Sequence, residues 1–201
     1  LSIGLLFAAV SLGIGVTLGL ASGYYGRWFD DSLQGLINVV TSLPGLPLLI
    51  IVGAMVRLGW VQLAVVLALL GWTGASRQVR GVVLSVRQRE YVMAARAVGA
   101  SDVRIMARHI LPNVFSIVLV MVGFDVAGAI LAESSLSFLG FGVQPPTATW
   151  GNMLSNSLAY TTRAPHLVVF PGLAISLTVL SVFLLADGLR DAMDPRLRGK
   201  P

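Results

Sequence analysis

Long apolar runs separated by short charged segments make up most of this chain. A helix that crosses the hydrocarbon layer of a membrane needs about 20 mainly apolar residues, and five runs come close to or exceed that length. The fourth opens with Pro112, which suits a first helical turn because an N–H there would have no partner. We therefore predict an all-α polytopic membrane protein of one domain, 1–201, with spans at about 1–24, 33–56, 59–80, 112–133 and 166–187.

The composition agrees with a membrane protein. The chain is 56% hydrophobic and 11% charged, whereas soluble domains carry about 25% charged residues. It has no cysteine, which excludes disulfides, thiol chemistry and cysteine metal sites. No basic segment precedes the first apolar run, so that run is not a recognisable signal peptide. We expect one further span upstream, which would give six in the intact subunit.

The basic residues are distributed unevenly between the two sides of the membrane. If the segment 81–111 lies in the cytoplasm, so does the tail 188–201, and the loop 134–165 lies outside, in the periplasm. Of the 14 Lys and Arg residues, only Arg57 and Arg163 are then outside. The positive-inside rule favours this orientation, which also explains the net charge of +5 without nucleic acid. The twelve inside are Arg27, Arg77, Arg80, Arg87, Arg89, Arg96, Arg104, Arg108, Arg190, Arg196, Arg198 and Lys200.

The segment from Arg87 to Leu111 has the pattern of two short amphipathic helices. Gly99 suits a left-handed residue that ends the first helix, and Ser101 is the candidate cap of the second, with Asp102 at its positive end. The first helix has an apolar stripe with helical spacing, formed by Tyr91, Ala94, Ala95 and Val98. The second has an apolar stripe formed by Val103, Met106 and Ile110, with Arg104 and Arg108 on the other face.

Two interpretations of this hairpin remain open. It could lie on anionic lipid, as basic amphipathic helices often do. Alternatively, it could be a docking element for a soluble subunit, because the two alanines in the first stripe allow a partner surface to approach closely. Composition alone does not separate the two.

Three blocks of residues resemble a known family. Tyr91-Val-Met-Ala94-Ala95, then Gly99 and, after nine residues, His109-Ile-Leu111-Pro112-Asn113 resemble the "EAA" loop of ATP-binding-cassette (ABC) importer permeases. Two further blocks resemble the C-type permease subunit of the dipeptide/oligopeptide/nickel branch. They are Glu133-Ser-Ser-Leu-Ser-Phe-Leu-Gly-Phe-Gly-Val-Gln-Pro-Pro-Thr147 with Trp150-Gly-Asn-Met-Leu154, and Phe170-Pro-Gly-Leu-Ala174 with Asp187-Gly-Leu-Arg-Asp-Ala-Met-Asp-Pro195.

The resemblance implies a fold, a function and partners. The fold would be the type I ABC importer transmembrane domain with a cytoplasmic coupling-helix hairpin, in a bacterial or archaeal plasma (inner) membrane. The chain would form the path for di- or oligopeptides or a related small solute, or for nickel or a metal chelate. Its partners would be a second homologous permease, two ATP-binding subunits and an extracytoplasmic substrate-binding protein. ATP and Mg would then bind those subunits and not this chain.

The resemblance also implies which residues contact the ATPase, and one residue departs from the family pattern. The expected contact residues are Glu90, Tyr91, Ala94, Ala95, Arg96, Val98 and Gly99. Met93 stands at the position of the glutamate in the EAA triplet. Glu90, three residues earlier on nearly the same face, is the candidate to replace it.

Other positions are candidates for the transport path. Asp125 lies within the fourth span. An ionisable side chain inside a membrane span usually has a function, so Asp125 is a candidate for the transport path. The alternative is a structural role, in which Asp125 forms a hydrogen bond with a polar partner in the bundle or in the paired permease. Glu133 and Trp150 are candidate contacts for the path or the binding protein, although Glu133 could simply anchor the span at the outer interface.

Glycines also recur every fourth residue in the first span, at Gly15, Gly19 and Gly23. This spacing suits tight helix packing, within the chain or against a partner permease. We expect Pro44, Pro47 and Pro171 to break their spans.

The sequence excludes several other functions. It has no phosphate-binding loop of the Gly-x-x-x-x-Gly-Lys-Ser/Thr type and no His-Glu-x-x-His motif. His109 and His166 would lie on opposite sides of the membrane, so they cannot share a metal. We therefore expect no catalytic, cofactor or metal site in this chain. A self-sufficient ion channel or secondary transporter, centred on Asp125, remains the alternative from another class.

Overall fold

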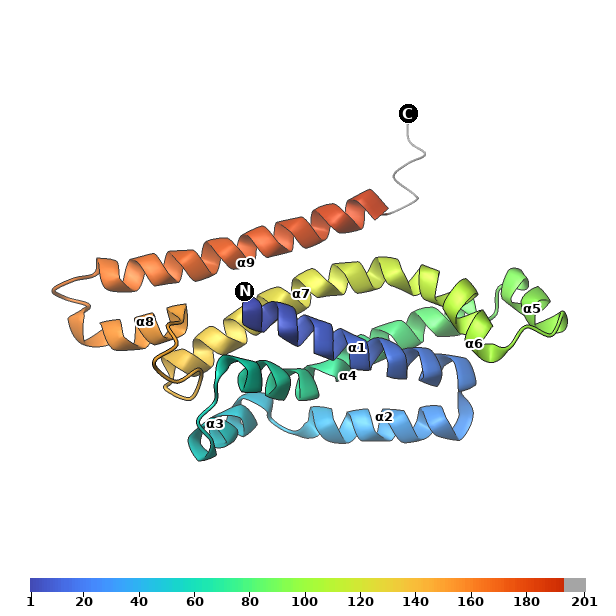
Figure 1. Ribbon diagram of the computed structural model, residues 1–201, viewed down its shortest axis with the longest axis horizontal. Helices are drawn as coiled ribbons and strands as arrows, with labels where there is room; N and C mark the ends of the chain where they lie inside the picture. The colour runs from blue at the N-terminus through green and yellow to red at the C-terminus, as the bar shows by residue number, and fades with distance from the viewer. Residues whose placement is uncertain (194–201) are drawn as a thin grey trace.

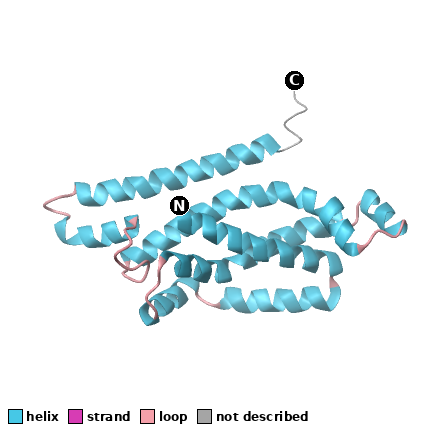
Figure 2. Ribbon diagram, viewed as in Figure 1, coloured by secondary structure: helices cyan, strands magenta, loops and turns pink. Residues whose placement is uncertain are grey.

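The computed structural model describes residues 1–193, and those residues form helices and loops without a strand (Figure 2). The tail residues Arg196, Arg198 and Lys200 lie outside the described part. The elements run α1 (Ser2–Tyr25), α2 (Arg27–Ser42), α3 (Gly45–Met55), α4 (Trp60–Val86), α5 (Glu90–Ala97), α6 (Asp102–Ile105), a π-helical turn η1 (Met106–Ile110), α7 (Leu111–Phe138), α8 (Trp150–Ser157), a 3₁₀ turn η2 (Leu158–Tyr160) and α9 (His166–Met193). Figure 1 shows the long helices lying side by side, with α5 and α6 at one end and α8 at the other.

Three helices are long and apolar enough to cross a membrane. They are α1, the continuous helix over Asp102–Phe138, and α9. The pair α2 and α3 brings the number to four if it counts as one bent span, with an angle of 72° between its halves. The helix α4 is 27 residues long but is not among those that qualify. The helices thus support three or four of the five predicted spans, and the span over 59–80 stays a prediction.

Proline has different effects in two of these helices. Leu43 is extended and separates α2 from α3 just before Pro44, as expected for a residue that precedes proline. The predicted break near Pro44 is therefore confirmed, although α2 already begins at Arg27, six residues before the predicted start. The predicted break at Pro171 is wrong, because α9 continues through it. Pro171 is only the sixth residue of α9. The backbone hydrogen bond that it removes therefore lies near the start of the helix, and most of the helix is unaffected.

The glycine stripe packs within the chain. A Cβ atom placed on Gly15, Gly19 or Gly23 would lie 2.6 Å from an atom of α4. These glycines therefore let the backbones of α1 and α4 approach closely. The idea that the stripe could serve a partner permease is not supported, because α4 already covers it. Gly13 is on another face and has nothing within 4 Å.

The helix α7 joins the two ends of the molecule through its packing on α1, α4, α8 and α9. Near its middle, an apolar cluster brings together Leu12, Met121, Ile130 and Val179. The outer side of α9 is largely uncovered, and Leu177, Leu180 and Leu184 are exposed. Such a surface suits lipid or another membrane chain.

We name the two ends of the bundle by their residues. The arginine end holds α5, α6, Arg80 and Arg87, and the tryptophan end holds Trp60, Trp150 and α8. At the tryptophan end α7 extends to Phe138. The first five residues of the predicted loop over 134–165 are therefore helical. At the arginine end α4 extends to Val86, which shortens the predicted loop over 81–111 by six residues.

Candidate functional site

The first helix of the hairpin, α5, ends as its sequence predicts. Gly99 has a φ of +81°, and its N–H donates to the Arg96 carbonyl oxygen at 3.0 Å. The Ala100 N–H donates to the Ala95 carbonyl oxygen at 3.1 Å. This pair of hydrogen bonds is the Schellman motif, in which glycine takes the left-handed position at lowest cost. The prediction that Gly99 is a left-handed residue ending the first helix is confirmed.

The helix α5 packs on the bundle through Val92, which is 1% exposed. The apolar stripe predicted from the sequence lies mostly on the open side, where Tyr91, Ala94 and Val98 are exposed and only Ala95 is half-buried. Val98 is 84% exposed. An apolar face left uncovered beside charged residues is typical of a surface that binds a partner. Met93, in place of the EAA glutamate, lies exposed here too, as do Glu90 and Arg96.

The second half of the hairpin departs from the prediction. Ile105 and Ile110 are fully buried, whereas Val103 is 70% exposed, so the predicted stripe of Val103, Met106 and Ile110 is wrong. The reason is the π-helical turn Met106–Ile110, whose wider turn brings residues five apart onto one face. Ser101 holds the cap position, but its side chain makes no cap hydrogen bond. The helix then runs on into α7 without a break.

Three side chains fasten the hairpin to the end of α1. The Tyr24 hydroxyl donates to Asp102 Oδ1 at 2.6 Å. The Arg96 guanidinium lies 5.2 Å from the centroid of the Tyr24 ring, within the range of a cation–π interaction. Arg87 donates to the carbonyl oxygens of Gly23 at 2.8 Å and of Tyr24 at 3.3 Å. It thereby satisfies carbonyl groups that the end of a helix leaves without partners.

A buried ion pair lies beside these contacts. Arg80 donates to both Asp30 carboxylate oxygens at 2.5 Å, and the Ser22 hydroxyl donates to Asp30 Oδ1 at 2.6 Å. Asp30 is 8% exposed. The group ties the start of α2 to α1 and α4. Sequence reasoning missed it because it counted Arg80 only as a cytoplasmic charge and did not consider Asp30, although an acidic residue so close to a span was a usable signal.

The tryptophan end contains a cavity of about 600 Å³. Glu133 lines it and is 6% exposed, so the alternative of a simple anchor at an open interface does not describe it. Ser137 donates to Glu133 Oε1 at 2.7 Å. Trp150 lines the same cavity and opens α8, which Thr149 caps by accepting from the Asn152 N–H at 3.2 Å.

Asp125 is not among the residues that line this cavity. Its Oδ2 atom is buried and has no hydrogen-bond partner among the described residues. The alternative of a polar partner inside the chain's own bundle therefore finds no support, and a partner in a second subunit remains open. Of the three path candidates, Glu133 and Trp150 thus line one cavity, and Asp125 lies apart from it.

No group of three His, Asp or Glu side chains that could hold a metal occurs in the part of the chain that the structure describes.

Comparison with known proteins identifies the family. Residues 15–199 match the family described as "binding-protein-dependent transport system inner membrane component". The chain belongs to this family. The match covers the hairpin, the glycine stripe and Glu133, so both ends described above lie within the part that members of the family share.

Several members of the family are similar over nearly the whole chain. A glutathione transport system permease protein of Pectobacterium atrosepticum is 41% identical over 198 residues, which are 98% of this chain and 66% of that protein. An oligopeptide transport system permease protein of Mycobacterium tuberculosis is 40% identical over 198 residues, 98% of this chain and 68% of that protein. A glutathione transport system permease protein of Escherichia coli is 41% identical over 199 residues. The chain spans about two thirds of the length of these relatives.

Proposed function

We propose that this chain is the translocation subunit of an ATP-driven importer for peptides. Family membership supports a role in transport that depends on a binding protein. The names of its relatives support oligopeptides or glutathione-type peptides as the substrate class. A nickel or metal-chelate importer of the same branch is the alternative, and no relative reported above carries such a name. The chain itself has no catalytic role in this proposal.

The hairpin would couple this subunit to its motor. We assign the ATPase contact to the uncovered stripe of α5, with Glu90 at its start, Arg96 at its rim and Gly99 at its end. The stripe is apolar, and no other part of the described chain covers it. The hairpin that carries it is attached to α1 by the contacts of Tyr24, Arg96 and Asp102. A push on α5 would therefore reach α1 through Tyr24, and α2 and α4 through Asp30 and Arg80. This contiguous set of polar contacts is the observation that supports the proposal most directly.

The other partners follow from the same arrangement. Two ATP-binding subunits would bind at the arginine end, in the cytoplasm of a cell with the chain in its plasma membrane. A substrate-binding protein would dock at the tryptophan end. A second, homologous permease would complete the path, and the exposed apolar side of α9 is one surface open to it. ATP binding and loaded binding protein would then bias one two-state movement from opposite ends.

Cross-linking tests the assignment of the hairpin. The chain contains no cysteine, so Val98→Cys introduces a single reactive group on the stripe. In membranes that contain the whole importer, Val98→Cys should cross-link to an ATPase subunit. Met153→Cys, at the opposite end and 49% exposed, is the matched control and should not. Equal cross-linking of both variants, or of neither, contradicts the assignment.

The channel alternative requires a different result. A self-sufficient channel or secondary transporter would be fully active as the purified subunit in vesicles, without ATP or partners. The importer should show peptide uptake only when the ATPase subunits and ATP are present. Uptake by the isolated subunit would favour the channel and make Asp125 the first residue to test.

A further inference from the structure

The hairpin continues into α7 through a weak joint. A π-helical turn, Met106–Ile110, stands directly before α7, and Pro112 is the second residue of that helix. A π-helical turn is wider than an α-helical one, and proline has no N–H to donate to the preceding turn. Both features are places at which helices bend. A push that reached α7 only along the chain, through α6, would therefore be absorbed in part at this joint.

Three residues bridge the joint, one each from α5, the π-helical turn and α7. The Asn113 side-chain amide donates to the Tyr91 hydroxyl oxygen at 3.3 Å and to the His109 carbonyl oxygen at 2.8 Å. The ring centroids of Tyr91 and His109 lie 6.3 Å apart, with the planes tilted by 43°. This separation is typical of aromatic pairs. We name Tyr91, His109 and Asn113 the joint clamp.

An apolar layer joins the same three segments beneath the clamp. Val92, Ile110 and Val114 belong to one buried cluster, and each is at most 1% exposed. Each of them directly follows a member of the clamp in the sequence. Apolar packing is strong but has no preferred direction, whereas hydrogen bonds require a particular geometry. The layer therefore supplies most of the stability, and the clamp restrains how α5 is oriented on it.

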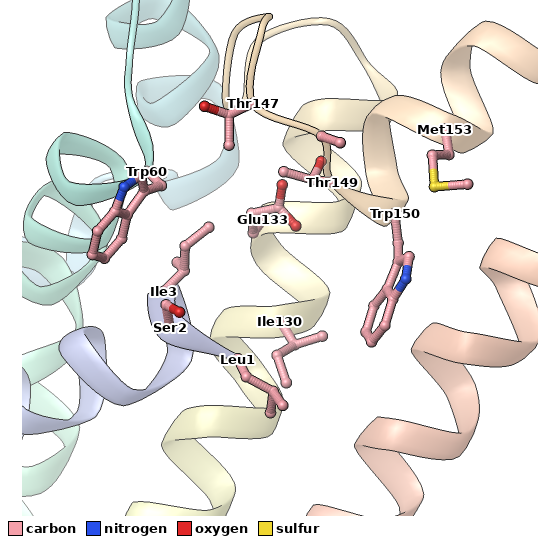
Figure 3. A pocket seen from close by; sticks show the side chains of 11 residues that line it. Leu1, Ser2, Ile3, Trp60, Ile130, Glu133, Thr147, Thr149, Trp150 and Met153 are labelled. Atoms are coloured by element: carbon pink, nitrogen blue, oxygen red, sulfur yellow. The ribbon is translucent and has the colours of Figure 1, made fainter.

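The helix α7 extends from the clamp to the opposite end of the molecule. Asn113 is its third residue, and Ile130 and Glu133 of the same helix line the cavity at the tryptophan end (Figure 3). At about 1.5 Å per residue, roughly 30 Å of helix separate Asn113 from Glu133. Movement that enters α7 at Asn113 is therefore carried along one helix to the tryptophan end.

We propose that Asn113 is a positioning residue that braces this joint, so that α5 and α7 move as one body. Asn113 acts through Tyr91, which belongs to the ATPase contact proposed above, and the inference rests on that proposed function. It deepens the proposed function by naming a second route from the motor into the spans. Tyr24 passes movement of the hairpin to α1, and the clamp passes it to α7.

The coupling ratio of the assembled importer tests the clamp. In Asn113→Leu the side chain keeps a similar size and loses both hydrogen bonds. In vesicles that contain the whole importer with its binding protein, we expect the ATP hydrolysed per peptide imported to rise at least about threefold, a factor within the range of one net hydrogen bond. Ser116→Ala is the matched control and should keep the wild-type ratio, because the Ser116 hydroxyl donates to the Asn113 carbonyl oxygen within α7.

A distance measurement shows whether the joint itself changes. The chain has no cysteine, so nitroxide labels can be attached at Ala97→Cys on α5 and Leu131→Cys on α7, both exposed, in a complex whose other subunits lack cysteine. With Asn113 intact we expect one narrow distance distribution that ATP does not shift. Asn113→Leu should broaden it, and Ser116→Ala should not.

The two measurements must agree. A higher coupling ratio in Asn113→Leu without a broader distance distribution means that Asn113 does not brace the joint. A broader distribution with a wild-type coupling ratio means that the brace has no part in coupling. Either result overturns the proposal, as does a distance that ATP shifts in the complex with Asn113 intact.

A double-mutant cycle decides whether Asn113 acts through Tyr91. Tyr91→Phe keeps the ring beside His109 and removes the hydroxyl, and it tests the same bond through the distance distribution if Asn113→Leu does not assemble. In the Tyr91→Phe background, Asn113→Leu should have no further effect on the coupling ratio, because the bond is already broken. Multiplied effects in the double variant would show that the two residues act independently, which contradicts the proposal.

The underlying function is tested separately. Cross-linking of Val98→Cys to an ATPase subunit, together with a wild-type coupling ratio in Asn113→Leu, removes only the brace. Absence of that cross-link removes the ATPase contact on which the brace depends. Absence of ATP-driven peptide uptake by the wild-type complex removes the importer.

Discussion

The Tyr24 hydroxyl donates a 2.6 Å hydrogen bond to Asp102 Oδ1 across 78 residues of sequence. The bond joins the last turn of α1 to the first turn of α6. Asp102 accepts it while lying at the positive end of the helix that continues into α7, where a carboxylate is favourable. The hairpin is therefore attached to α1 as well as to its own neighbours in sequence, and α1 is the helix that packs most closely on α4.

Replacement of Tyr24 by phenylalanine should loosen the hairpin. The change removes the bond to Asp102, which is worth about 1.5–3 kcal/mol when the acceptor is charged, and keeps the ring under Arg96. We expect faster hydrogen exchange in 90–105 and a severalfold smaller stimulation of ATPase activity by loaded binding protein. Tyr25→Phe is the control, because Tyr25 is 51% exposed and makes no recorded side-chain hydrogen bond. Equal exchange in the two variants would show that the bond holds nothing in place.

Loss of the Asp30 charge should destabilise the whole subunit. In Asp30→Asn, Arg80 loses its bidentate partner and stays partly buried, with 30% of its side chain exposed. Breaking a buried ion pair costs about 3–5 kcal/mol, and the exposure of Arg80 lowers our expectation to about 2 kcal/mol. Thermal unfolding of the purified complex measures the effect. Asp31→Asn changes an exposed neighbour and should leave the midpoint within experimental error; a similar loss in both variants would point to net charge instead of the ion pair.

Bulk added to the glycine stripe should disrupt the packing of α1 on α4. A Cβ atom on Gly19 would lie 2.6 Å from the Ser76 carbonyl oxygen and 2.9 Å from Val79 Cβ, so the two backbones would have to separate. We expect Gly19→Val to reduce the yield of folded subunit severalfold, as judged by detergent-stable monodisperse protein. Gly13→Val, where nothing lies within 4 Å, should insert and fold normally. Normal folding of both would mean that the approach of α1 and α4 is looser than the structure shows.

Local sequence patterns predicted the helices and turns well, because each depends on a few neighbouring residues. Apolar length located α1 and α9, and Gly99 located the end of α5. The predictions failed where distant residues decide. The π-helical turn before Leu111 changes the buried face from Val103 to Ile105, since a fixed helical period was assumed.

The candidate site was predictable in part for the same reason. The stripe of α5 could be read from its spacing, but its attachment to Tyr24 could not, because nothing local links residues 24 and 102. Glu133 and Trp150 were candidates separately. Their common cavity, with Trp60 as a third member, depends on how α4, α7 and α8 meet. Asp30 and Arg80, 50 residues apart, belong to the same class of contact.

Gly99 offers the sharpest test of the coupling role. Nothing lies within 4 Å of a Cβ placed on Gly99, so Gly99→Asp causes no clash, and its left-handed backbone costs about 1 kcal/mol. The subunit should therefore still insert and assemble. The added charge and altered turn would face the ATPase, and we expect ATP hydrolysis to continue while peptide uptake falls at least about tenfold.

Gly140 provides the matched control for this substitution. It also has a positive φ, +86°, with nothing within 4 Å of a Cβ, and the same pair of hydrogen bonds ends α7 there: Gly140 N–H to Ser137 and Phe141 N–H to Leu136. Gly140→Asp thus carries a similar backbone cost at the tryptophan end. The number of ATP molecules hydrolysed per peptide imported should rise in Gly99→Asp and stay near the wild-type value in Gly140→Asp. Wild-type uptake together with wild-type stimulated hydrolysis in Gly99→Asp would refute the placement of the ATPase contact on α5, because the subunit would then transmit force without that turn.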